Sequence, residues 1–375
     1  MTSHVCSGYS RYPLPVAAPR ITDAEAVARI SDAAEALCLI PAPTFAERPR
    51  GEEVLARLHA LHLDAAFDDA GNVVARIGDD GPALAVCAHL DTVFPADTPL
   101  TVRREGGRLI GPGIGDNALG IAVLLHVARE LVLAPPSSPV LIAFTVGEEG
   151  LGDLRGVSAL LDREPVRALI AIEGHGIDSL AVGGIASVRY RVTVTGPGGH
   201  SWTDRGRPSA VHQAIAIGEH ILACAPPAAI NIGTISGGTA INAIADRAEL
   251  LVDIRHADQR TVDAAAARVE RAVAVDVPAG LTVALEQVGN RPGGANLPGE
   301  PLLELARAAR SAVGLGSAEE HLASTDANAG HARGIPSVGI GITRGDHAHR
   351  PDEWIAEQPI ALGVAALIAL IRTAS

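Results

Sequence analysis

The sequence contains no lysine, so all 30 of its Lys and Arg residues are arginine. This absence excludes chemistry that needs a lysine amine, such as Schiff-base formation, and any phosphate-binding loop of the Walker type. The net charge of -13 argues against nucleic acid as a partner, because a phosphate backbone requires a basic protein face. The function must therefore rely on side chains other than lysine.

Cysteine and long apolar runs are also scarce. Cys6, Cys38, Cys87 and Cys224 form no C-x-x-C pair, which indicates reduced thiols rather than a disulfide framework or a cysteine-rich zinc site. No stretch reaches about 18 uninterrupted apolar residues, and the N-terminus lacks a basic start followed by an apolar core. We therefore expect a cytoplasmic protein with neither a signal peptide nor a membrane span.

Aromatic residues make up only 2% of the chain, while hydrophobic residues make up 47%. The core must therefore be built from Ala, Val, Leu and Ile. A chain of 375 residues exceeds the roughly 250 to 300 at which single cores stop growing. Two domains are expected.

Short apolar runs alternate with helical patterns along much of the chain. Strands are predicted at Leu84–Ala88, Pro139–Val146, Arg167–Ile172 and Ser337–Ile342, and a strongly apolar helix at Leu119–Leu133. This alternation predicts an α/β fold, a mixed central sheet flanked by helices, in which ligands collect beyond the carboxyl ends of the strands.

The segment 187–288 has a different texture. Its strands alternate apolar and polar residues, as in SVRYRVTVT from Ser187, which is typical of a sheet with one wet face. We therefore expect an inserted α+β domain at 187–288. The segments 1–186 and 289–375 would form the two parts of a catalytic domain.

Imidazoles and carboxylates follow the predicted strands, and no thiolate is among them. Such donors suit zinc, cobalt or manganese in a hydrolytic site. One carboxylate more than a single ion needs suggests two ions about 3.5 to 4 Å apart, which polarise the scissile carbonyl and lower the pKa of a bridging water. The candidates are His89, Asp91, Asp116, Glu148, Glu149, Glu173 and His349.

Two short patterns within this set have local meaning. His89 and Asp91 would lie on the same side of an extended chain, where the carboxylate can orient a metal-binding imidazole. The adjacent side chains of Glu148 and Glu149 diverge, so one can bind metal while the other moves a proton. A solvated acidic turn is the alternative for an isolated Glu-Glu pair, but this pair follows a buried strand.

Seven motifs together resemble the M20 family of metallopeptidases and amidohydrolases. This family includes acetylornithine deacetylase, succinyl-diaminopimelate desuccinylase, glutamate carboxypeptidase, peptidase T and aminoacylase. The resemblance implies a zinc-peptidase catalytic domain with an inserted lid and dimerisation domain. The motifs are AHLDTVFP (88–95), GPGIGDNALG (111–120), TVGEEGLGDLRG (145–156), AIEGHG (171–176), GPGGHS (196–201), GGTAINAIADRAELLVDIR (237–255) and AHRPDEW (348–354).

The resemblance also implies which residues hold the two divalent ions, with zinc favoured and cobalt or manganese as alternatives. Asp116 would bridge the ions, and the family often has a cis peptide at the bond that matches Asp116–Asn117. The first ion would be held by His89, Asp116 and Glu173, and the second by Asp116, Glu149 and His349.

Four further residues receive roles from the same resemblance. Glu148 would be the general acid and base, and Asp91 would orient His89. His200 would reach the active site of a partner subunit and help to stabilise the oxyanion, with Asn242 nearby. A homodimer formed through the lid domain is therefore expected.

The substrate is less sharply specified. Arg255, Arg291, Asp326 and Asn328 are candidates for binding a substrate carboxylate or amide. Several family members have Arg where this chain has Asn328, which leaves desuccinylase-like specificity open. The family's deacylases and carboxypeptidases tend to have Glu at the position of Glu173, which favours N-acyl amino acids or small peptides with a free carboxylate.

These observations lead to one prediction and two alternatives. The prediction is a two-metal hydrolase that cleaves an amide bond in a small, carboxylate-bearing substrate. A peptidase T-like aminopeptidase on di- and tripeptides is the first alternative, because the stretch GEEGLGDLRG resembles that enzyme. A non-catalytic binding module with the same fold is the second, although each of the seven site positions is filled by a competent residue.

Overall fold

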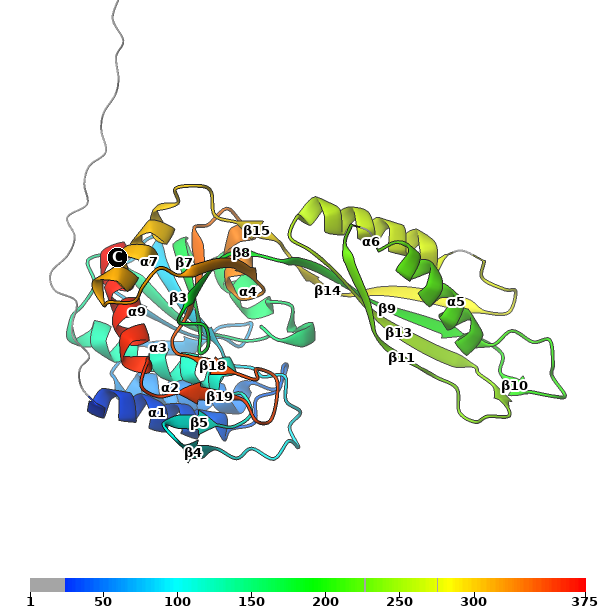
Figure 1. Cartoon of the computed structure of the whole chain (residues 1–375), viewed down its shortest axis with the longest axis horizontal. Helices are drawn as coiled ribbons and strands as arrows, with labels where there is room; N and C mark the ends of the chain where they lie inside the picture. The colour runs from blue at the N-terminus through cyan, green and yellow to red at the C-terminus, as the bar shows by residue number, and fades with distance from the viewer. Residues whose placement is uncertain (1–23, 226, 275) are drawn as a thin grey trace, which may run out of the picture.

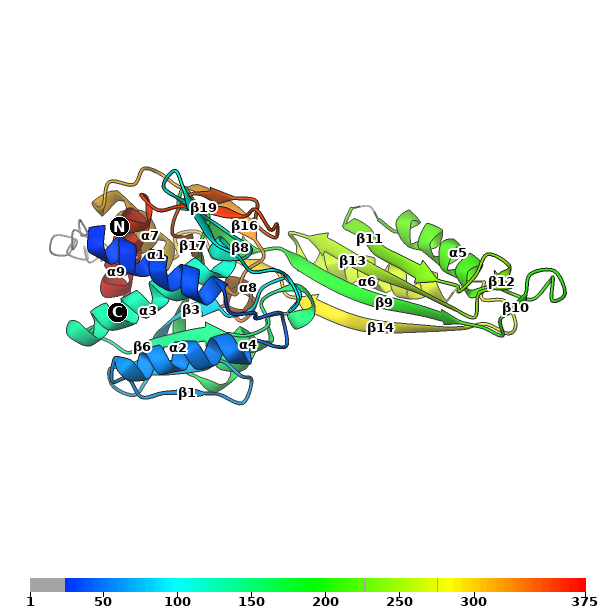
Figure 2. The same cartoon turned by 90° about the horizontal axis from the view of Figure 1, so that it is seen from below.

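The computed structural model describes residues 24–225, 227–274 and 276–375. The chain forms two lobes that lie end to end (Figure 1). We call residues 186–291 the projecting lobe and the rest of the described chain the large lobe. Two long strands, β9 (Ala186–Thr195) and β14 (Thr282–Arg291), lead from one lobe into the other (Figure 2). The first 23 residues of the predicted segment 1–186 lie outside the described residues.

The large lobe is built on a nine-stranded sheet. In sheet order its strands are β1 (Ala65–Phe67), β2 (Val73–Ile77), β6 (Val140–Thr145), β3 (Ala83–His89), β7 (Val166–Glu173), β17 (Ser337–Gly341), β8 (Ser179–Gly184) and β15 (Gly294–Ala295), with β16 (Glu319–Ala323) beside β8. β3 pairs in parallel with β6 and β7, and β7 pairs in parallel with β17. The carboxyl ends of these four strands therefore meet at one edge.

Helices cover both faces of this sheet. They are α1 (Ala24–Cys38), α2 (Arg48–Ala60), α3 (Gly120–Leu133), α4 (Arg155–Arg163), α7 (Pro301–Ala312), α8 (Ala327–Ala332) and α9 (Ile360–Ala374). On one face, Leu84 and Val86 of β3 share a core with α1, α2, α3, α7 and α9. On the other face, Ala85 and Cys87 pack with α4 and α8. Burial on both faces explains the uninterrupted apolar strands, and the predicted α/β fold is confirmed.

A small four-stranded sheet joins two distant parts of the sequence. Its order is β18 (Gly345–Asp346), β19 (Trp354–Ala356), β5 (Arg108–Ile110) and β4 (Arg103–Glu105). The antiparallel pairing of β19 with β5 brings the segment after β17 beside the glycine-rich turn that precedes α3. The sequence analysis did not anticipate this sheet, because its strands are only two or three residues long.

The projecting lobe is an antiparallel sheet with helices on one side. The sheet order is β11 (Ala229–Gly237), β13 (Arg247–His256), β9 and β14, and the helices are α5 (Ala210–Ala223) and α6 (Gln259–Val273). Tyr190 and Val192 of β9 face the helices and are buried, whereas Arg191 between them is only half-buried. The prediction of one wet face is confirmed. At the far end, β10 (Gly199–His200) pairs with β12 (Ala243–Ile244).

The described cysteines are free thiols, as expected. Cys38 and Cys87 are buried and Cys224 is half-buried, while Cys6 lies outside the described residues. Burial raises the pKa of the Cys87 thiol well above its usual value, which makes it a poor nucleophile. Within the described chain, no helix combines the length and the apolar character needed to cross a membrane.

Candidate active site

The parallel strands of the large lobe deliver polar side chains to one cavity. His89 is the last residue of β3 and Glu173 is the last residue of β7, while Glu148 and Glu149 follow β6. These four side chains line a cavity of about 490 Å³. This is the edge at which an α/β sheet collects its ligands.

Asp116 and His349 reach the same cavity from loops outside the main sheet. Asp116 lies between two imidazoles, because its Oδ1 is 3.0 Å from Nε2 of His89 and its Oδ2 is 3.0 Å from Nε2 of His349. The Asp116–Asn117 peptide bond is cis, as the sequence analysis expected. A carboxylate that offers one oxygen to each of two imidazoles has the placement of a bridging ligand.

The remaining predicted ligands lie on either side of Asp116. Glu173 Oε2 is 3.7 Å from His89 Nε2, and Glu149 Oε1 is 3.2 Å from His349 Nε2. His89, Asp116 and Glu149 each offer one ligand atom, and these three atoms lie within 4.8 Å of one another. The structure therefore brings together all five residues that the sequence analysis named as metal ligands.

The cluster carries more buried negative charge than its neighbours neutralise. Burial raises the pKa of the Glu173 carboxyl to about 7, against the opposing contact with His89. Hydrogen bonds to Asp116 and Glu149 raise the pKa of His349 to about 10. Burial lowers the pKa of His89, but contacts with Asp116, Asp91 and Glu173 outweigh it and raise that pKa overall. Imidazoles and excess carboxylates of this kind fit divalent zinc, cobalt or manganese.

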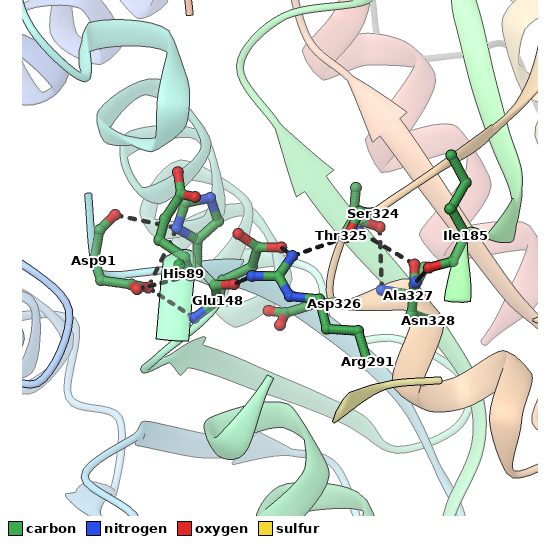
Figure 3. Close-up of polar contacts among 12 residues, drawn as sticks. His89, Asp91, Glu148, Ile185, Arg291, Ser324, Thr325, Asp326, Ala327 and Asn328 are labelled. Carbon is green, nitrogen blue, oxygen red and sulfur yellow. Dashed lines mark hydrogen bonds and ion pairs between the residues drawn. The ribbon is translucent and has the colours of Figure 1, made fainter. Parts of the chain in front are cut away.

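Glu148 and Glu149 point to different partners. Glu149 faces His349, whereas Glu148 Oε1 lies 3.2 Å from Nη1 of Arg291 (Figure 3). Both glutamates are buried. Burial raises the pKa of Glu148 well above its usual value, although Arg291 opposes this rise. A carboxyl with a raised pKa beside a ligand cluster is suited to accept and return a proton.

Asp91 connects the end of β3, which carries His89, to the loop that carries Glu148 and Glu149. Its Oδ1 accepts the backbone N–H of Glu148 at 3.0 Å, and its Oδ2 accepts that of Glu149 at 2.9 Å and the Thr44 hydroxyl at 2.9 Å. Oδ1 of Asp91 also lies 3.5 Å from Nδ1 of His89, on the ring side away from Asp116. Asp91 can therefore orient His89 while it holds the glutamate loop in place.

Three arginines of the projecting lobe line the same cavity, namely Arg189, Arg255 and Arg291. Asp253 contacts two of them, with Oδ1 3.1 Å from Nε of Arg189 and Oδ2 2.5 Å from Nε of Arg255. Arg291 is buried and donates to the Glu148 carbonyl oxygen and to the Ser324 hydroxyl, the latter at 2.8 Å. One aspartate for two guanidinium groups leaves positive charge available for a substrate anion.

Asp326 and Asn328 do not line this cavity, which corrects their expected contact with substrate. Asp326 is 2% exposed and Asn328 is 1% exposed. Asp326 accepts a hydrogen bond from Thr145, and the Asn328 amide donates to the carbonyl oxygens of Ile185 and Pro292. Asp326 and Asn328 lie beside Ser324 and Thr325 in the same turn (Figure 3), and only Ser324 and Thr325 of these four line the cavity.

His200 and Asn242 lie away from this chain's cavity. His200 belongs to β10, at the far end of the projecting lobe (Figure 1), and Asn242 directly precedes β12, which pairs with β10. Both are exposed, and neither is among the residues that line the cavity. Any role for them in catalysis would have to be played in another subunit.

The structure adds residues that the sequence analysis did not select. Arg189 faces the cavity from the wet side of β9, where it looked like an ordinary solvent-facing residue. Glu353 is buried beneath the Asp116 turn and accepts backbone hydrogen bonds from it. The available signal was its place in the motif AHRPDEW, shortly after His349.

Comparisons with known proteins agree with this geometry. Residues 85–373 match the sequence profile of peptidase family M20/M25/M40. A Mycobacterium tuberculosis protein provisionally assigned as the succinyl-diaminopimelate desuccinylase DapE is 30% identical over 337 residues, which cover 85% of this chain and 91% of that protein.

Solved structures with the same fold extend over nearly the whole chain. Aminopeptidase PepT from Bacillus cereus superposes with a TM-score of 0.72 at 21% identity, covering 92% of this chain and 98% of the other. The YXEP protein of Bacillus subtilis, described as a dinuclear metal-binding peptidase of the M20 family, gives 0.66 at 19% identity, covering 93% and 98%. At these identities, the two comparisons show that this chain has the same fold as those proteins.

Proposed function

Because the chain belongs to peptidase family M20/M25/M40 and is a hydrolase of that family, we propose that it cleaves the amide bond of small N-acyl amino acids that carry a free carboxylate. One observation carries this proposal. The cavity combines a cluster of imidazoles and carboxylates, a separate buried glutamate and a group of arginines. These are the parts needed to activate water, to move a proton and to hold a carboxylate.

We propose two zinc ions per chain, with cobalt or manganese able to replace them. His89, Asp116 and Glu173 would hold one ion, and Glu149 and His349 would hold the other with Asp116 shared. This assignment is supported by the two 3.0 Å contacts that Asp116 makes to the imidazoles. When bound, such a pair supplies Lewis acidity and lowers the pKa of a bound water.

Glu148 is the proposed proton carrier. Its carboxylate takes a proton from the attacking water as the new C–O bond forms, and returns a proton to the leaving nitrogen as the C–N bond breaks. The products are a carboxylate and a free amine, so one water is consumed. The burial of Glu148 and its position beside Glu149 and Arg291 support this role.

The arginines of the projecting lobe are the proposed carboxylate binders. Arg255 is partly exposed beside Asp253 and can turn its guanidinium towards a substrate carboxylate, with Arg189 next to it. Arg291 holds Glu148 and Ser324, so its first role is to place the proton carrier. A substrate carboxylate that approaches Ser324 would share Arg291 with these groups.

We propose that the segment 187–288 acts as a lid and dimerisation domain, and that His200 and Asn242 complete the oxyanion site of a partner subunit. Their exposure at the far end of the projecting lobe supports a role outside their own chain. Trp202 and Ile241 nearby are also exposed, as expected for side chains that a second copy would cover.

We also propose a cytoplasmic location. The free thiols of Cys38 and Cys87 support it, because reducing compartments keep thiols unpaired.

The test combines metal analysis with a substrate panel. Purified protein would be analysed for bound metal and assayed on N-acetyl and N-succinyl amino acids and on free dipeptides, before and after chelation. We expect about two ions per chain, and turnover of N-acyl amino acids that chelation abolishes and metal restores. Glu148→Gln should lower kcat by about 10² to 10⁴-fold without loss of metal.

One control variant and two alternative outcomes complete the test. Glu52→Gln changes an exposed glutamate on α2 and should behave as the wild type. Turnover that requires a free α-amino group, and that N-acylation abolishes, would establish the aminopeptidase alternative. Absence of metal binding and of turnover in both substrate classes would leave only a binding module with this fold.

A further inference from the structure

One distant residue, Glu353, accepts several backbone hydrogen bonds from the turn that carries Asp116. Oε2 of Glu353 accepts the N–H of Gly113 at 2.8 Å, and Oε1 accepts the N–H groups of Gly115 and Asp116, each at 2.8 Å. The backbone carbonyl of Glu353 also accepts the N–H of Gly111 at 2.8 Å. Glu353 thus receives hydrogen bonds along the whole turn, although 237 positions separate it from Asp116.

Glu353 is also part of the segment that carries His349. Its own N–H donates to the carbonyl of Arg350 at 3.1 Å, and β19 begins at the next residue. His349 has a φ of +66°, in the left-handed region that residues other than glycine rarely adopt. Such a conformation persists only where surrounding contacts hold it.

Glu353 is closely packed by its neighbours. Its side chain is fully buried, and among the described residues His175 is the imidazole within ion-pair distance, with Nε2 3.3 Å from Oε1. A Cβ at Gly115 would lie 2.2 Å from that same Nε2. The turn can therefore pack against His175, beside the carboxylate, only because residue 115 is glycine.

We infer that Glu353 is a positioning residue of the metal centre, which fixes Asp116 and His349 relative to each other. Its carboxylate accepts from the backbone of the proposed bridging ligand, and its own backbone closes the turn that follows the proposed second-ion ligand. One residue that is not part of the cavity lining therefore connects the two segments that carry these ligands. The inference rests on the proposed function, because it takes Asp116 and His349 as ligands.

Two oxygens are required for this role. Glutamine at position 353 would keep one carbonyl oxygen but would turn its NH₂ towards at least one of the N–H donors of Gly113, Gly115 and Asp116. Two opposed donors in a buried site repel each other, so the turn would shift. Aspartate would keep both oxygens but would be one methylene too short to reach all three donors.

The test uses Co²⁺ as a spectroscopic probe, so no enzymatic activity is needed. Metal-free wild type, Glu353→Gln and Glu353→Asp would be titrated with Co²⁺, with the affinity and the visible absorption bands recorded. Groups that orient metal ligands typically change affinity by about 10 to 100-fold when they are mutated. We expect a loss of that size in both variants, together with altered cobalt bands that report a changed ligand geometry.

Glu357→Gln is the matched control, because Glu357 lies in the same segment and its side chain forms an ion pair with Arg104 at 3.9 Å. It should titrate as the wild type does. Far-UV circular dichroism of the metal-free proteins shows whether each variant folds. If Glu353→Gln does not fold, the cobalt titration of Glu353→Asp tests the inference. Wild-type cobalt affinity and bands in a folded Glu353 variant would overturn the inference, whereas a wild type that binds no cobalt would overturn the proposed function.

Discussion

The two lobes use their sheets in opposite ways. In the large lobe, β3 and β6 are buried along their whole length and run parallel, so polar groups appear only where the strands end. In the projecting lobe, β9 and β13 are antiparallel and alternate between buried and partly exposed residues. One sheet concentrates its polar side chains at an edge, and the other spreads them over a face.

Because of this difference, the two lobes contribute different groups to the cavity. The edge of the large lobe gathers His89, Glu148, Glu149 and Glu173 within one cavity. The projecting lobe contributes arginines to that cavity from the ends of its strands nearest the large lobe, near the start of β9 and near the ends of β13 and β14. The proposed metal ligands and the proposed proton carrier therefore lie in the large lobe, whereas the projecting lobe supplies arginines that hold Glu148 and can bind a substrate anion.

The largest expected effect comes from breaking the bridge in the large lobe. Asp116→Asn removes the negative charge that lies between His89 and His349. A proposed ligand should matter more than a group that only orients ligands, so we expect kcat/KM to fall by about 10³-fold or more with loss of bound metal.

Elemental analysis and steady-state assays would measure both changes. Asp97→Asn, an exposed aspartate of the same lobe, is the control and should keep metal and activity. Full activity in Asp116→Asn would show that the cluster is not the catalytic centre.

A core substitution in the projecting lobe should have the reverse pattern. Ile217 on α5 is 0% exposed, and Ile217→Ala should lower the free energy of unfolding by about 2 to 5 kcal/mol. Metal content should stay unchanged, because no ligand comes from this lobe.

Denaturant unfolding monitored by circular dichroism would give the stability change. Ile215→Ala, on the same helix but 55% exposed, should change it by less than about 0.5 kcal/mol. Loss of metal in Ile217→Ala would contradict the division of work between the lobes.

Much of the large lobe could be predicted because its signals are local. Buried parallel strands give continuous apolar runs, and a polar residue that ends such a run lies at the carboxyl edge of the sheet. His89 and Glu173 were found in this way, and the structure places them 3.7 Å apart. Asp116 and His349 were also among the candidates, but their sharing of an ion was implied only by motif resemblance, since the small sheet that brings their segments together has strands too short to show a period.

The remaining features depend on tertiary contacts that leave no pattern in the sequence. Asp326 and Asn328 looked available in a polar turn, but their side chains are buried and do not line the cavity. Arg189 looked like a solvent-facing residue of a wet strand, and only the placement of the lobes turns it to the cavity. For Glu353 the sequence offered only its place in the motif AHRPDEW, because its carboxylate bonds to backbone N–H groups, which carry no residue identity.

The smallest expected effect concerns acid and a buried histidine of the large lobe. His331 on α8 of the large lobe is 8% exposed, neither ring nitrogen has a hydrogen-bond partner, and burial lowers its pKa to about 4. The unfolded chain binds this proton near pH 6.5, so the stabilisation is complete above pH 6.5 and is lost as the pH falls towards 4, by up to about 3 kcal/mol. His331→Leu should flatten the decline in the unfolding free energy of the metal-free protein between pH 6.5 and 4, whereas His321→Leu, at an exposed position on β16, should leave it unchanged. An undiminished decline in His331→Leu would mean that other groups of the large lobe take up the protons.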